Sequence, residues 1–285
     1  MSALALTACS LGFGLDREQC EKTADCSGFG NAECVDKVCV AIESTGGGGA
    51  GGSVPVDPKW DCIGNVEPPD PGGDTVRHVY RFVLAVDESH VPDNLSTQVC
   101  AGIDPDCENP KPGFPQPDAN GLLELDLPVN DLSSFLKITS DETMPTTVFL
   151  QRPIIIPQTE KIIRMVSLET IIALAEGAAD VPYDPLKSSA VILTSNCLDE
   201  RTSGVRIESA AADQDTVPFY FNSSIPNPDV TETDTQGAGG FLNLPPGPAT
   251  VKIYRASTDE LIGTGTFLGQ AGVLSYLPIG PTEGD

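Results

Sequence analysis

Cysteine and histidine are the residue types that most limit the chemistry of this 285-residue chain, which contains nine cysteines and two histidines. Cysteine thiols are acylated, cross-linked as disulfides or used as zinc ligands. An odd number of cysteines in an exported chain leaves one thiol that no internal disulfide can use. If that thiol is Cys9, the others make four pairs, drawn from Cys20, Cys26, Cys34, Cys39, Cys62, Cys100, Cys107 and Cys197.

Cys9 ends a short apolar run, Leu6-Thr7-Ala8-Cys9, and Ser10 follows it. This stretch resembles the lipobox of bacterial lipoproteins, in which the cysteine is acylated and becomes the new N-terminus. The resemblance implies a membrane anchor of two or more acyl chains, palmitate among them, because a single chain binds only marginally. By analogy with Gram-negative lipoproteins, Ser10 rather than Asp favours the outer membrane, with the protein facing the periplasm or the cell surface.

Residues 1–9 are predicted to be the end of a lipoprotein signal peptide that is truncated in this sequence. They carry no Lys or Arg before Cys9 and are shorter than the roughly 7–15-residue apolar region of a signal peptide plus its charged start. We therefore expect the true start codon to lie upstream. The alternative is an ordinary N-terminus that contains Leu-Thr-Ala-Cys by chance.

Residues 10–44 form a cysteine-rich segment in which Cys20, Cys26, Cys34 and Cys39 are spaced C-x5-C-x7-C-x4-C. The segment has too few apolar residues to build a core, so two disulfides are expected to replace burial. Their connectivity is left open among three choices. A zinc site is the alternative, but structural zinc sites usually offer C-x2–4-C pairs, to which only the Cys34–Cys39 gap comes close, and no histidine lies nearby.

The remaining four cysteines are expected to pair as Cys100 with Cys107 and Cys62 with Cys197. Cys100 and Cys107 flank a turn-rich stretch that could close a small loop, which leaves a long-range link for the other two. On the chain-entropy model the short loop is worth roughly 2.5 kcal/mol and the long one roughly 5 kcal/mol.

A linker at residues 45–57 is predicted from the glycine-rich stretch Thr45–Ser53, a flexible coil that spans ~15–18 Å. Behind it, residues 58–188 are expected to form a first β-sandwich unit with one short helix, and residues 189–285 a second unit. No apolar run approaches the ~18 residues that a membrane-spanning helix needs.

The predicted fold class is mainly all-β. Apolar and polar residues alternate in 76–86 and 121–127, and short strand-like runs occur at 189–195, 204–208, 249–256 and 272–277. One helix is predicted over Leu168–Glu176, with Ser167 as its N-cap and Gly177 at the C′ position.

A short sequence motif occurs once in each half of the body. Asp118-Ala-Asn-Gly121 and Asp234-Thr-Gln-Gly237 are both D-x-x-G turns, each followed by a strand and a Leu-Pro corner. The second copy resembles the carboxypeptidase regulatory-like domain, a transthyretin-like (prealbumin-like) β-sandwich, from Ser195 to the end of the sequence. The positions that fit the family pattern are Asp234, Gly237, Phe241, Leu244, Pro245, Gly247, Val251 and Ile253.

That resemblance implies an accessory domain rather than a peptidase. The first copy, Thr97–Phe149, lacks the aromatic residue and the Gly after Leu-Pro. The H-x-x-E zinc motif of metallocarboxypeptidases is absent as well, because His78 is followed by Arg81 and His90 by Asp93.

Few residues support an enzyme. His78 lies on the apolar face of its predicted strand, which is typical of a core histidine, and His90 lies in a predicted loop. A Ser-His-Asp triad assembled in space is the alternative, but no G-x-S-x-G elbow is present. An envelope hydrolase is thus the least favoured function.

Clusters of acidic residues raise the alternative of calcium binding at Asp104, Asp106 and Glu108, or at Asp213 and Asp215. Neither cluster matches the EF-hand pattern, and clustered acids are expected by chance when 41 acidic residues face 16 basic ones. The sequence therefore predicts no metal and no cofactor. The net charge of −25 also argues against nucleic acid as a partner.

The sequence as a whole predicts a non-catalytic, lipid-anchored envelope protein that presents a binding or scaffolding surface. Its expected partners are the membrane, through the N-terminal lipid, and a surface protein or glycan. A carbohydrate- or peptide-binding module is the alternative and would need exposed aromatic side chains. The candidates are Trp60, Tyr183, Phe219 and Tyr220.

Overall fold

The computed structural model divides the chain into two compact units, Met1–Val54 and Pro55–Asp285. It describes residues 57–66, 75–128, 134–150, 160–178, 180–222 and 225–282, together with Lys22 and the backbone of 32–35 and 38–41. In the first unit, β1 (Ala32–Val35) pairs antiparallel with β2 (Val38–Ala41), and Cys34 lies opposite Cys39 in the register. Cys9, Cys20 and Cys26 lie outside the described residues.

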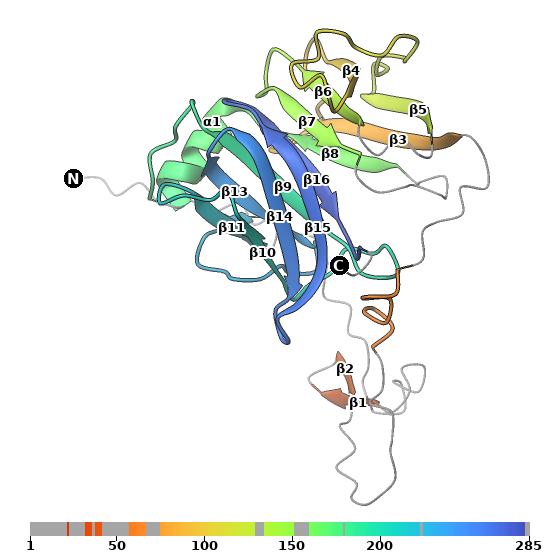
Figure 1. Cartoon of the computed structure of the whole chain (residues 1–285), viewed down its shortest axis with the longest axis vertical. Coiled ribbons are helices and arrows are strands. Elements are labelled where there is room, and N and C mark those ends of the chain that lie inside the picture. Colours follow the sequence, from red (N-terminus) through yellow and green to blue (C-terminus); the bar gives the residue numbers. More distant parts are fainter. Residues whose placement is uncertain are drawn as a thin grey trace, which may run out of the picture. The chain divides into compact units, whose positions relative to one another are not determined.

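The second unit is built from three sheets, so the all-β prediction is confirmed (Figure 1). The longest has eight strands in the order β12 (Ile225–Asn227), β11 (Val217–Asn222), β13 (Ala238–Leu244), β9 (Ser188–Thr194), β16 (Leu274–Ile279), β7 (Thr146–Phe149), β6 (Ser134–Thr139) and β4 (Ser96–Ala101). The other two have three strands each. They are β5 (Leu122–Pro128), β3 (Thr75–Leu84) and β8 (Lys161–Met165), and β10 (Val205–Ser209), β14 (Gly247–Arg255) and β15 (Glu260–Gly269).

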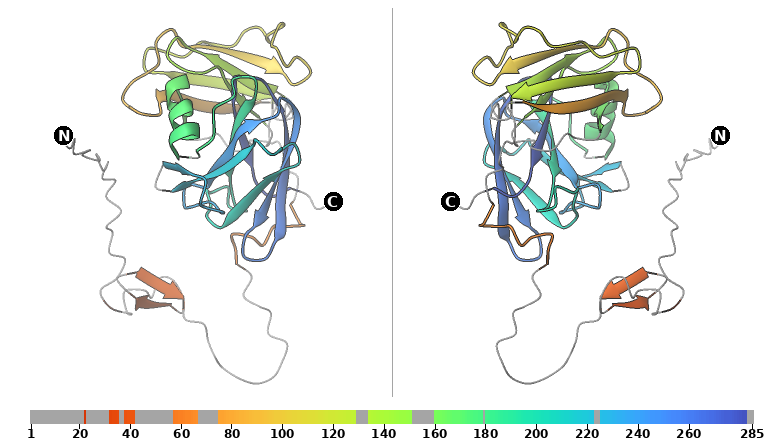
Figure 2. Two further views of the ribbon diagram at one scale, coloured as in Figure 1. Left: turned by 90° about the vertical axis from the view of Figure 1, so that its left-hand side faces the viewer. Right: turned by 90° about the vertical axis from the view of Figure 1, so that its right-hand side faces the viewer.

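Both faces of the long sheet are buried over its central strands. One face contributes side chains such as Leu136, Val191 and Leu274 to a core shared with the β5–β3–β8 sheet and the helix. The other face contributes Ile192 and Leu277, among others, to a second core shared with the β10–β14–β15 sheet. Figure 2 shows these layers from two sides. Strand β13 is accordingly buried at every position, as expected for a strand covered on both faces.

Strand β16 joins the two halves of the body within the long sheet. It runs parallel to β7 on one side and parallel to β9 on the other. The strands on its two sides come from residues 96–149 and from residues 188–244, so the predicted boundary at 188/189 falls at the start of a strand in the shared sheet.

The two D-x-x-G turns have the same geometry in the structure. Gly121 and Gly237 both have positive φ, at 72° and 58°, and each donates its N–H to the carbonyl of the Asp three residues earlier, at 2.9 Å. Each glycine carbonyl then accepts the N–H of a neighbouring strand residue, Phe82 at 3.0 Å and Thr194 at 2.7 Å. The repeat therefore places an equivalent turn before β5 in one half and before β13 in the other.

The helix begins where the sequence predicts but ends differently. Ser167 is the N-cap of α1 (Leu168–Ile172), and its Oγ accepts the N–H of Thr170 at 3.1 Å. The chain then widens into a π-helix, η2 (Ala173–Ala178), which contains Gly177. The prediction that Gly177 is the C′ residue is wrong. The wider turn carries the helix past it, and Asp180 adopts the left-handed conformation instead, with φ 53°.

Candidate functional site

The disulfides of the second unit pair the cysteines as expected from the sequence. Cys62 is bonded to Cys197, with their Cα atoms 5.7 Å apart, and Cys100 is bonded to Cys107, with Cα atoms 5.4 Å apart. The backbone N–H of Cys197 also donates to the carbonyl of Lys59 at 2.9 Å. The chain just after the predicted linker is therefore fastened to the loop that follows β9.

The Cys100–Cys107 bond closes a compact loop at the end of β4. Both cysteines are buried and pack with Phe135 on the side of the long sheet away from β3. The carboxylate of Asp104 accepts two backbone N–H groups, from Glu108 at 3.0 Å and from Asn109 at 2.7 Å. Asp104 thus caps its own loop, which is the ordinary structural role of an aspartate in a turn.

Two side chains from elsewhere in the fold hold this loop in place. Lys137 Nζ donates to the carbonyl of Asp106 at 2.8 Å. Gln270 Nε2 donates to the carbonyl of Pro105 at 2.8 Å and to Asp106 Oδ1 at 3.2 Å. The loop is consequently anchored to β6 and to the turn between β15 and β16.

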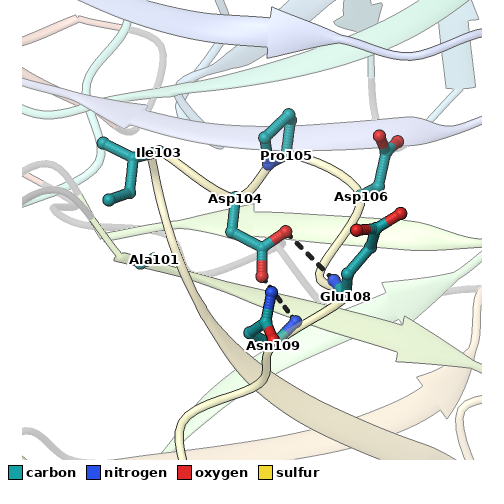
Figure 3. Close-up of a pocket in the computed structure, with 7 residues that line it drawn as sticks. All are labelled: Ala101, Ile103, Asp104, Pro105, Asp106, Glu108 and Asn109. Atoms are coloured by element: carbon teal, nitrogen blue, oxygen red, sulfur yellow. Dashed lines mark hydrogen bonds between the residues drawn. The ribbon is translucent and has the colours of Figure 1, made fainter.

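An open hollow of about 490 Å³ lies against the loop (Figure 3). Ile103 stands on one side of it and is 94% exposed, whereas Asp106 and Glu108 lie together on the other side. The lining residues are Ala101, Ile103, Asp104, Pro105, Asp106, Glu108 and Asn109. The hollow therefore combines the exposed side chain of Ile103 with the carboxylates of Asp106 and Glu108 on a covalently closed loop.

The second acidic cluster is engaged by a lysine. Lys187 Nζ donates to Asp213 Oδ2 at 2.5 Å and lies 4.0 Å from Asp215. The hydrogen bond from Lys187, followed by that from Thr216, lowers the pKa of Asp213 to about 2. This cluster forms an ion pair between the start of β9 and the turn before β11.

Two of the four predicted binding aromatics are core residues, which corrects the expectation that they are exposed. Phe219 is 6% exposed and Tyr220 is 5% exposed, and they lie on opposite faces of β11. Both faces of β11 are covered, so neither ring can stack on a sugar. Trp60 and Tyr183 are partly buried, each packed against one of the two cores.

The two histidines occupy separate environments. His78 is 6% exposed, and its Nδ1 lies 3.1 Å from the hydroxyl of Tyr80. Burial, with a smaller contribution from Lys161, lowers the pKa of His78 to about 4. His90 Nε2 lies 3.1 Å from Glu142 Oε2 at the surface. Neither arrangement is a Ser-His-Asp triad.

Glu142 is a neighbour of His90 that the sequence analysis does not single out. It comes 52 positions later in the chain, in the turn between β6 and β7. The backbone N–H of Asp93 also donates to Glu142 Oε2, at 2.7 Å. The only feature of the sequence that bears on this contact is that His90 and Glu142 both lie in polar segments typical of turns.

No helix among the described residues has the length and apolar character needed to cross a bilayer.

The sequence matches no protein-family model and no curated protein. Partial likeness to solved structures is found for the TIE protein of Bacillus anthracis, with 14% identity and a TM-score of 0.24 over 73% of this chain. This chain spans 34% of the length of that protein. The shaft pilin SpaA of Lactobacillus rhamnosus GG is similar at 8% identity and a TM-score of 0.22, over 73% of this chain and 98% of the pilin. A streptococcal ancillary pilin has 10% identity and a TM-score of 0.22, over 72% of this chain and 68% of that chain. Likeness at these scores assigns neither a family nor a function.

Proposed function

We propose that this chain is a non-catalytic, lipid-anchored protein of the cell envelope whose β-layer body presents a binding or scaffolding surface. The lipid would be carried by Cys9 at the outer membrane. The cysteine-rich segment 10–44 and the linker 45–57 would connect this anchor to the body.

The disulfide between Cys62 and Cys197 is the observation that carries the proposal. Disulfides persist in oxidising compartments and are rare in the cytosol, so two of them in one body favour an exported protein. Cys62 also follows the predicted linker closely, and its partner follows β9 in the middle of the long sheet. A pulling force on the linker would therefore act on the loop after β9 through the Cys62–Cys197 bond. It would not first separate β3 from β5 and β8.

The Cys100–Cys107 loop is the surface that best supports binding. Its conformation is fixed by the disulfide and by hydrogen bonds from Lys137 and Gln270. A preorganised loop loses little conformational entropy when a partner binds. The partner would need to offer an apolar contact for Ile103 and positive charge for Asp106 and Glu108.

A carbohydrate- or peptide-binding module is the second candidate, and the hollow at this loop is the observation that favours it. Its volume of about 490 Å³ falls within the range of small-molecule pockets, which is roughly 300–1,000 Å³. Among the described residues, no aromatic residue on which a sugar could stack lines the hollow, so its carboxylates favour a basic peptide over a neutral glycan.

The anchor is tested on the full chain with its native upstream sequence, isolated from the membrane fraction. Intact mass should show a chain that begins at an acylated Cys9. Thiol alkylation should label the other eight cysteines only after reduction. A Cys9→Ser variant should lose the lipid and leave the membrane. An unmodified Cys9, or free labelling without reduction, would overturn the proposed compartment.

The binding surface is tested on glycan and peptide arrays with an Ile103→Ser variant. Its matched control is Leu198→Ser, because Leu198 is also an exposed apolar residue, at 57%. Binding that is lost in Ile103→Ser and kept in Leu198→Ser would support the loop as the binding surface. Equal binding by both variants would place the surface elsewhere.

A further inference from the structure

We propose that His90, Asp93 and Glu142 form a site for a divalent transition-metal ion of the Zn²⁺ class. The candidate ligand atoms of the three side chains, one imidazole nitrogen and two carboxylate oxygens, all lie within 4.8 Å of one another. The site is separate from the Cys100–Cys107 loop and adds a binding activity to the proposed function.

The three ligands come from two loops that the backbone holds together. His90 and Asp93 lie between β3 and β4, and Glu142 lies between β6 and β7. The carbonyl of His90 accepts the N–H of Leu84 at 3.0 Å, which ties this loop to the end of β3. The carbonyl of Asp93 accepts the N–H of Asp141 at 3.2 Å, which joins the two loops.

Ligand spacing already suits a small ion for two of the three donors. A zinc ion bound at 2.0–2.2 Å in a tetrahedral site holds neighbouring donor atoms roughly 3.3 Å apart. His90 Nε2 and Glu142 Oε2 lie 3.1 Å apart. The carboxylate of Asp93 needs only to turn about its side-chain torsions to complete three protein ligands.

The type of donor selects the class of metal. Zn²⁺ accepts imidazole nitrogen together with carboxylate oxygen, whereas Ca²⁺ and Mg²⁺ prefer oxygen ligands alone. Two carboxylates and a neutral imidazole balance the charge of a divalent ion. The His90 ring and the Glu142 side chain are 43% and 34% exposed, so water can fill the remaining coordination position.

Some exposed carboxylates of this protein form ion pairs with basic side chains, whereas others, such as Asp87 and Asp141, form none among the described residues. Glu88 pairs with Arg164, and Asp213 pairs with Lys187. Among the residues that the structure describes, Glu142 has His90 as its ion-pair partner, and no Lys or Arg forms an ion pair with Asp93. A cation at this point would therefore neutralise charge that no basic side chain neutralises.

The experiment measures Zn²⁺ binding by calorimetry to the metal-stripped, disulfide-intact full chain. The wild type should bind one Zn²⁺ at this site, and saturating Zn²⁺ should raise the Tm by about 5 °C or more. His90→Gln and Glu142→Gln should each weaken binding roughly tenfold or more, since each removes a ligand. Both variants should keep the circular-dichroism spectrum of the metal-free wild type.

Glu88→Gln is the matched control, because Glu88 lies in the same loop but pairs with Arg164. It should bind Zn²⁺ like the wild type. Absence of binding by the wild type would overturn the proposal. Binding that His90→Gln leaves unchanged would also overturn it and would place the metal elsewhere in the chain. Ca²⁺ binding of equal strength, unaffected by His90→Gln, would show a non-selective acidic surface.

Discussion

Phe219 and Tyr220 are consecutive residues of β11, yet their rings lie in two different cores on opposite faces of the long sheet. Tyr220 has a second role, because its hydroxyl accepts the N–H of Ile207 at 2.8 Å and donates to the carbonyl of the same residue at 3.4 Å. Ile207 belongs to the edge strand β10. One side chain thus satisfies the backbone of a strand in another sheet.

Replacing Tyr220 with Phe should destabilise the body without creating a cavity. The ring stays in place, but the buried N–H and C=O of Ile207 lose their partner, which costs ~1–3 kcal/mol. Urea denaturation measures the change. Tyr254→Phe is the control and should stay within about 0.5 kcal/mol of the wild type, because its ring contacts Arg206 while its hydroxyl bonds to none of the described residues. Equal effects would contradict the role of the Tyr220 hydroxyl.

The glycine of the second D-x-x-G turn should tolerate no side chain. A Cβ on Gly237 would lie 2.7 Å from both the carbonyl of Thr194 and the N–H of Thr202, and φ there is +58°. Gly204 also has positive φ, but a Cβ there would meet nothing within 4 Å. Gly204→Ala should therefore cost ~1–2 kcal/mol from backbone strain alone. Gly237→Ala should cost ~1–3 kcal/mol more, as overpacking does. Thermal denaturation of the two variants tests the order, and a Gly237→Ala chain as stable as Gly204→Ala would disprove the close contact.

Removal of the two disulfides should have unequal effects. The Cys62–Cys197 bond spans 135 residues and the Cys100–Cys107 bond spans 7. Double Cys→Ser variants should lose about 5 kcal/mol and about 2.5 kcal/mol of unfolding free energy, respectively, if the unfolded chain behaves as a random coil. Guanidinium denaturation under non-reducing conditions compares them. A larger loss from the short loop would point to packing of Phe135 on Cys100 and Cys107 as the dominant contribution.

Acid should destabilise the body through His78. Its pKa is lowered to about 4 in the folded state from an ordinary value of 6.5, so the unfolded chain takes up the proton first as the pH falls. The folded state is thus favoured fully above pH 6.5, and up to about 3 kcal/mol is lost as the pH falls from 6.5 to about 4. His78→Gln should flatten that part of the stability profile. A His78→Gln chain that keeps the wild-type slope between pH 6.5 and 4 would contradict this role of His78.

Local sequence patterns predict those strands, turns and helix caps whose structure depends mainly on residues close in the sequence. Strands β3 and β5 alternate between buried and exposed residues and are visible in the sequence, as are the Ser167 cap and both D-x-x-G turns. Strand β6 has no such alternation, because both of its faces are covered and the consecutive residues Ser134, Phe135 and Leu136 are all buried. The sequence analysis for this reason misses β6, and it also misses β4, β7, β8, β11 and β12.

Long-range pairing explains why the sites are harder to predict. The burial of Phe219 and Tyr220 depends on two layers that cover β11 from opposite sides, and neither layer is evident from the residues around them. Glu142 meets His90 only because β6 and β7 bring a distant turn to the end of β3. The disulfide partners are predictable only because few cysteines remain once the short loop is closed.

The place of β16 sets the order in which this body can be completed during synthesis. Residues 274–279 are the strand between β7 and β9, and both of those neighbours are made earlier by the ribosome. Until residues 274–279 emerge, each neighbour has an open edge and the long sheet remains in two pieces. The long sheet can therefore close only after residue 279 has emerged from the ribosome.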